Sequence, residues 1–137
     1  MVRPIVKDKF LLSQKSAPAD RSDLQVAQDL VETIAAHAEE CVGMAANMIG
    51  VLKRIIVFQE FNRYVVMINP QVVWASPATY DTNEGCLCHE GAKDVTRHEE
   101  IEVEFLDLRM RKCRVKYSGI TAEIIQHEMD HLEGILI

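Results

Sequence analysis

The sequence lacks any apolar run long enough to cross a lipid bilayer, and its first eight residues contain neither an apolar core nor a signal-cleavage pattern. It also lacks internal repeats, low-complexity tracts and a linker-like segment. These absences argue against a membrane protein and a repeat protein. We therefore expect a cytoplasmic protein with a single domain over residues 1–137, a normal length for one substantial core.

An excess of positive charge is missing as well. The formal net charge is −6, and the basic residues are scattered apart from the stretch Arg109–Arg114. That stretch alternates charged and apolar residues, which is typical of a strand with one solvated face. A protein that binds phosphate backbones would have a basic surface, so we expect no direct binding of nucleic acid and no binding to a membrane.

The sequence has few cysteines, and their number and the expected compartment indicate whether they form disulfides. The four are Cys41, Cys86, Cys88 and Cys113. An even count could reflect disulfides, but a cytoplasmic chain with a good core does not need them. We expect free thiols or metal ligands instead.

The pattern of apolar residues predicts a first helix and a pair of strands. Ser22 and Gln25 fit a capping box, and an apolar stripe follows at spacings of three and four from Leu24 to Ala38. The segment 41–50 is predicted to be a loop of small residues. The β-branched runs 54–58 and 64–68 predict an antiparallel pair, the second ended by Asn69-Pro70, with a short strand over 72–74.

The second half predicts two more strands and a final helix. Apolar and charged residues alternate over 101–105 and 112–117, as in half-buried strands. A last helix is predicted from Ser118 or Gly119 to Leu132, stopped by Gly134. A helix, several antiparallel strands and a helix form an α+β pattern.

The strongest motif is H-E-x-x-H, from His127 to His131. Two histidines four residues apart lie on one face of a helix, so both imidazoles can bind one divalent metal. Glu128, beside them, can take a proton from a water on that metal. Ile120 and Ile124 continue the same face, which predicts that the histidines point into the core. A buried pair without a metal would be costly to satisfy.

The third ligand of such a site must come from upstream. A catalytic metal usually has three protein ligands and one open position, and too little chain remains after His131 to supply another comfortably. The candidates by residue type are Cys86, Cys88, His89, Cys41, Cys113, His37 and His98. The densest cluster is 86–89, but spacing alone does not choose between Cys86, Cys88 and His89.

Three separated motifs resemble those of the peptide deformylase family. They are Gly43-Met44-Ala45-Ala46, then Glu84-Gly85-Cys86-Leu87, then Gln126-His127-Glu128-x-Asp130-His131, in the family's order and over residues 22 to the end. The combination of E-G-C-L with a terminal H-E-x-D-H is highly specific. The resemblance implies an α+β fold in which antiparallel strands pack around a C-terminal metal-binding helix.

The resemblance also assigns roles. It implies a hydrolase that removes the formyl group from the N-terminal formyl-methionine of newly made proteins, with Cys86, His127 and His131 as ligands of one divalent metal. It implies Fe(II), which Zn or Ni often replaces, and a thiolate with two imidazoles suits all three metals. Glu128 is implied as the acid/base and the Leu87 N–H as a donor to the oxyanion.

Substrate binding and partners follow from the same resemblance. The backbone of Val42, Gly43 and Gly85 is implied to align the peptide as an added strand. The implied partners are N-formylmethionyl peptides of nascent chains, at the ribosome exit, and we expect a monomer. Arg97 is a candidate ion-pair partner of Glu84, by resemblance to an arginine downstream of E-G-C-L.

The sequence departs from the family at three positions. Cys41 replaces the leading glycine of the first motif, Met48 replaces its glutamine, and Cys88 replaces the serine that usually follows E-G-C-L. Methionine cannot donate a hydrogen bond, so an oxyanion donor is missing unless Asn47 takes its place. Two other functions therefore stay open: an attenuated paralogue that binds metal and N-acyl peptides, and an amidase for another N-acyl substrate.

Overall fold

Two antiparallel sheets organise the computed structural model, which describes residues 1–137. The larger sheet has five strands in the order β1-β2-β3-β6-β7. Its strands are β1 (Gly43–Ala45), β2 (Ile55–Glu60), β3 (Arg63–Ala75), β6 (Glu100–Leu106) and β7 (Lys112–Ser118). The smaller sheet pairs β4 (Thr79–Gly85) with β5 (Ala92–His98).

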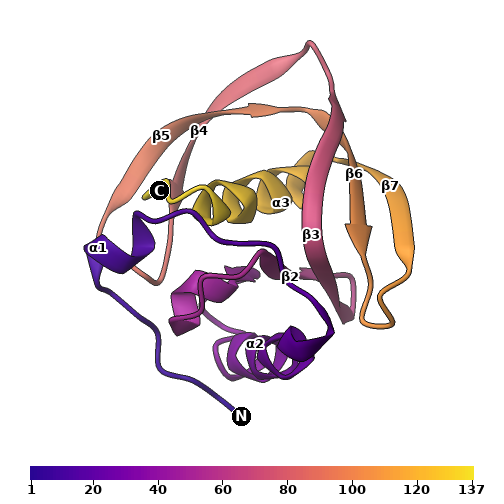
Figure 1. Cartoon of the computed structure of the whole chain (residues 1–137). Helices are drawn as coiled ribbons and strands as arrows, with labels where there is room; N and C mark the ends of the chain where they lie inside the picture. The colour runs from indigo at the N-terminus through magenta and orange to yellow at the C-terminus, as the bar shows by residue number, and fades with distance from the viewer.

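Three α-helices accompany the sheets. They are α1 (Lys9–Leu12), α2 (Leu24–Ala36) and α3 (Gly119–Leu132), with 3-10 turns at Arg21–Asp23 and Ala46–Ile49. Figure 1 shows α3 surrounded by strands of both sheets, whereas α2 lies outside, beside β2. None of the helices combines the length and the apolar composition that a membrane span requires.

The alternation of side chains along β2 divides the core into two clusters. Ile55 and Val57 point toward α2 and pack with Leu30 and Ile34. Ile56 and Phe58 point to the other face and belong to the cluster that contains Ile125 and Leu132 of α3. Successive strand residues face opposite sides of a sheet. The apolar run 55–58 is therefore continuous because both faces of β2 are covered.

The predicted start of the first helix is wrong in detail. Asp20, not Ser22, is the capping residue: its side chain accepts the Ser22 N–H at 2.8 Å, and the Asp23 carboxylate accepts the Asp20 N–H at 2.9 Å. Gln25 instead donates to Asp29, at 2.9 Å. Aspartate is as good a capping residue as serine, and a second candidate stood two positions upstream.

The predicted antiparallel pair is confirmed, but Asn69-Pro70 does not end its second strand. The register of β3 against β6 shifts between Ile68 and Gln71, and Asn69 adopts a left-handed φ of 52° inside this irregularity. The Asn69 side chain accepts a hydrogen bond from the Ala19 N–H at 2.8 Å and donates one to the Ala19 carbonyl at 2.9 Å. Proline is tolerated at such a bulge, so the predicted short strand over 72–74 is part of β3.

The other strand and helix predictions hold, with two exceptions. β6, β7 and α3 lie where the patterns placed them, and Gly134 follows α3 with φ of 77°. The segment 41–50, predicted as a loop, contains β1 and a 3-10 turn. The strands β4 and β5 were missed because their residues are mostly exposed and show no clear apolar alternation.

Gly134, just after α3, lies too close to the backbone of Ser13 to accommodate a side chain. A Cβ there would lie 2.4 Å from the Ser13 carbonyl oxygen, whereas Gly91, with φ of 79°, has nothing within 4 Å of its position. Alanine in a left-handed conformation costs about 1–2 kcal/mol. We predict that Gly134→Ala lowers the free energy of unfolding by more than this, and that Gly91→Ala shows the backbone cost alone, both measured by urea denaturation. An equal or larger loss in Gly91→Ala would contradict the steric argument.

Candidate metal centre

The buried face of α3 presents three polar side chains close together. His127, Glu128 and His131 are 7%, 4% and 0% exposed. The Nε2 atoms of the two histidines lie 3.1 Å apart. The predicted direction of the pair, into the protein, is therefore correct. Ile120 does not share it: this side chain is 67% exposed, at the rim of a cavity.

Glu84 fixes the orientation of His127. Its Oε1 lies 2.7 Å from His127 Nδ1, so the imidazole donates its Nδ1 proton and keeps a lone pair at Nε2. Burial opposes the ionisation of Glu84, but hydrogen bonds from Arg97 and His127 outweigh burial and lower its pKa to about 2. Burial also lowers the pKa of His127, but contacts with Cys86 and Glu84 outweigh it and raise that pKa above its ordinary value.

The expected partner of Glu84 is present. Arg97, which is 4% exposed, donates to both Glu84 oxygens, at 3.1 and 2.7 Å. Its remaining nitrogen donates to Asp130 at 2.6 Å. Asp130 has a role that sequence reasoning missed, because the contact depends on the pairing of β4 with β5. One guanidinium thus connects the smaller sheet to α3.

Two sulfur atoms approach the histidines from the turn after β4. Cys86, Cys88 and His131 form one group whose ligand atoms lie within 4.8 Å of one another, and His127, Glu128 and His131 form a second. The two groups share His131. Neither group contains the remaining upstream candidates, which are His89, Cys41, Cys113, His37 and His98. Among them, Cys41 lines the cavity, and burial raises the pKa of its thiol to about 12, which keeps it protonated.

The residues around His131 fit a divalent metal. Glu128 Oε1 and His131 Nδ1 are buried without a hydrogen-bond partner, and two imidazole nitrogens face each other at 3.1 Å. Unpaired polar groups are costly in a protein interior. A cation bound among these donors would give them a common partner. Imidazole and thiolate donors suit borderline metals such as Zn, Fe and Ni.

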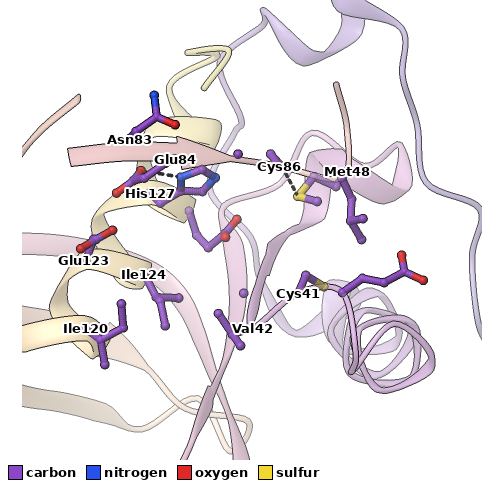
Figure 2. Close-up of a pocket in the computed structure, with 15 residues that line it drawn as sticks. Cys41, Val42, Met48, Asn83, Glu84, Cys86, Ile120, Glu123, Ile124 and His127 are labelled. Carbon is purple, nitrogen blue, oxygen red and sulfur yellow. Dashed lines mark hydrogen bonds and ion pairs between the residues drawn. The ribbon is translucent and has the colours of Figure 1, made fainter. Parts of the chain in front are cut away.

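A cavity of about 480 Å³ opens beside these groups. Its wall, drawn in Figure 2, combines α3, the end of β4 and the segment that enters β1. Glu128 lies on this wall. Burial raises the pKa of Glu128 well above its ordinary value, and the negative charges of Cys86 and Glu84 add to the rise. A carboxyl group whose protonated form is favoured in this way is suited to proton transfer.

Glycine at position 43 gives Glu128 its space. A Cβ on Gly43 would lie 2.8 Å from Glu128 Oε2 and 2.7 Å from Ile124 Cγ2. The carbonyl of the preceding Val42 accepts the Gln59 N–H at 2.8 Å, which directs it into the sheet. By the alternation of a strand, Gly43 directs its own N–H and carbonyl to the free edge of β1. Val42 lines the cavity with its side chain instead.

The amide of Asn47 does not point to the cavity. Asn47 is fully buried, and its Nδ2 donates to the carbonyl of His131 at 3.0 Å. Met48 does line the cavity, and its Sδ lies 3.9 Å from Cys86 Sγ. In this structure Asn47 secures the end of α3 and does not replace the missing glutamine.

Known proteins of one family match almost the whole chain. The sequence model of the family described as polypeptide deformylase matches residues 2–137. A peptide deformylase of Clostridium beijerinckii is 50% identical over the full length of both chains. One of Thermomicrobium roseum is 42% identical over 85% of this chain and 70% of its own.

Solved structures give the same result. The structure of a class I type b peptide deformylase from Acinetobacter baumannii with Met-Ala-Ser bound has a TM-score of 0.89 and 30% identity, over 99% of this chain and 97% of its own. Peptide deformylase from Thermotoga maritima has a TM-score of 0.87 and 29% identity, over 99% and 94%. The predicted α+β architecture around a C-terminal helix is therefore confirmed. The chain belongs to the polypeptide deformylase family, a family of hydrolases that use a divalent metal to remove the formyl group from the N-terminus of new proteins.

Proposed function

We propose that residues 1–137 form one catalytic domain in which Cys86, His127 and His131 hold the metal and Glu128 transfers the proton. The observation that carries this proposal is the convergence on His131 of two groups of potential ligands, one from the turn after β4 and one from α3. Three of these side chains suffice as ligands, and Glu128 is left as the base. Fe(II) is our proposal for the native metal, with Zn or Ni as substitutes.

The bound metal would supply Lewis acidity toward the attacking water and the formyl oxygen. A residue of the chain itself transfers the proton. Glu128 Oε1 has no partner, and its carboxyl group lies beside the cavity. It can accept a proton from the attacking water and deliver it to the leaving amine. Because burial favours the protonated form, the carboxyl holds the proton between the two steps.

The two free strand edges are our proposed site for the peptide backbone. β1 pairs only with β2 and β4 only with β5, so each leaves one edge unpaired. Gly43 on β1 and Gly85 at the end of β4 would bond the substrate as an added strand, with Val42 contributing a side-chain wall. The N–H of Leu87 would donate to the developing oxyanion.

We further propose that the chain works as a monomer in the cytoplasm, on formyl-methionyl nascent chains near the ribosome exit. The family acts on formylated N-termini of nascent chains. The net charge of −6 gives no support to direct binding of ribosomal RNA, so encounter with the peptide end itself is the simpler arrangement.

The role of Glu128 can be tested with Fe(II)-loaded protein under anaerobic conditions. We predict that Glu128→Gln lowers kcat for formyl-Met-Ala-Ser by about 10²–10⁴ while one metal per chain remains bound. Glu133→Gln, an exposed position just beyond α3, is the matched control and should leave both quantities unchanged. If the metal content of Glu128→Gln falls in step with activity, Glu128 is a ligand and the assigned role is wrong.

The missing oxyanion donor gives a second test. We predict that Met48→Gln raises kcat, by up to about 10²–10³ when the new amide reaches the oxyanion, and that Met48→Leu, which adds no donor, does not. Because the Asn47 amide is bound to the carbonyl of His131, Asn47→Ala should lower thermal stability more than it lowers kcat.

An unchanged kcat in Met48→Gln, with the metal still bound, would remove this position from the chemistry. A specific loss of kcat in Asn47→Ala, with Tm preserved, would show that Asn47 has taken over the role of the glutamine.

A further inference from the structure

Cys88 is a buried reactive group that the proposed chemistry does not use. It is 1% exposed and belongs to the apolar cluster beneath α2. Its Sγ lies 3.2 Å from Cys86 Sγ, within the distance of a hydrogen bond between sulfur atoms. No other side chain bonds Cys88. Its thiol is therefore directed at one atom, the sulfur proposed as a metal ligand.

The proposed ligand role of Cys86 sets the direction of this hydrogen bond. A thiolate bound to a metal has no proton and can only accept, so the proton between the two sulfurs must stay on Cys88. A donor to a ligand atom withdraws charge from it and restricts its orientation. Such partners typically change metal affinity by about 10–100-fold.

Direct coordination by Cys88 is the competing arrangement. Its Sγ lies in the same group as Cys86 and His131, so distance alone would permit it. Four protein ligands, however, make a closed structural site, whereas hydrolysis requires an open position for water. The family to which the chain belongs catalyses hydrolysis, which favours Cys88 as a donor.

We propose that Cys88 is a positioning residue whose S–H donates to the Cys86 sulfur and tunes the metal centre without binding the metal. The proposal rests on the proposed ligand role of Cys86. A serine at this position would also donate, whereas alanine or valine would not. Valine retains the apolar packing that alanine loses, which separates the hydrogen bond from the filling of the core.

The test uses Co(II) as the probe metal, because thiolate bound to Co(II) gives a charge-transfer absorption band. The wild type is compared with Cys88→Ser, Cys88→Ala and Cys88→Val. Without the donor, the sulfur electrons lie higher in energy. We expect Cys88→Ala and Cys88→Val to shift the band to lower energy and to weaken Co(II) binding by about 10–100-fold. Cys88→Ser should keep the band position and bind Co(II) within a few-fold of the wild type.

Two results would overturn the proposal. A band at the same position in all four proteins would mean that Cys88 only fills the core. A large loss of band intensity in Cys88→Ser would mean that Cys88 is itself a ligand. Cys86→Ser serves as the separate control: persistence of the full band in that variant would refute the ligand role of Cys86 and not the contact between the two sulfurs.

Discussion

The buried ion pair between Glu84 and Arg97 fixes β4 and α3, which carry the proposed metal centre, relative to one another. Glu84 lies on β4 and Arg97 on β5, and the same two side chains contact His127 and Asp130 of α3. A charge pair away from water persists only if its hydrogen bonds are complete, since a missing partner leaves an uncompensated charge. This requirement fixes the smaller sheet against the helix. Cys86, two residues beyond Glu84, takes its position from that arrangement.

A second constraint is the close approach of α3 to β1. Gly43 has no side chain where Glu128 and Ile124 come nearest. One missing Cβ thus serves two purposes: it makes room for the proposed base, and it leaves the backbone of β1 accessible from the cavity. The helix in turn depends on Asn47, whose amide bonds the carbonyl of His131 just after β1. The first and last motifs are therefore coupled by direct contacts, although more than eighty residues separate them.

Sequence reasoning identified the side chains that gather around α3 more completely than the contacts that hold them in place. The spacing of His127 and His131 placed both on one helix face. Apolar alternation predicted β6 and β7, and β-branched runs predicted most of β2 and β3. The pairing of β4 with β5 was not predictable, because polar exposed strands carry no periodic signal. Without that pairing, Asp130 had no visible partner. The hydrogen-bond partner of the Asn47 amide could not be predicted either, because a one-residue offset in a short turn changes the direction of the side chain.

The unpaired edges of β1 and β4 have a consequence for solubility. An enzyme that binds a peptide through backbone hydrogen bonds needs unpaired strand edges. Such edges can also pair with strands of other protein molecules, which leads to aggregation. Here β1 is only three residues long, and all three residues are buried. β4 carries the exposed polar side chains of Asp81 and Asn83. The short length of β1 and the polar side chains of β4 disfavour the addition of further strands. A single short peptide end can still enter the cavity.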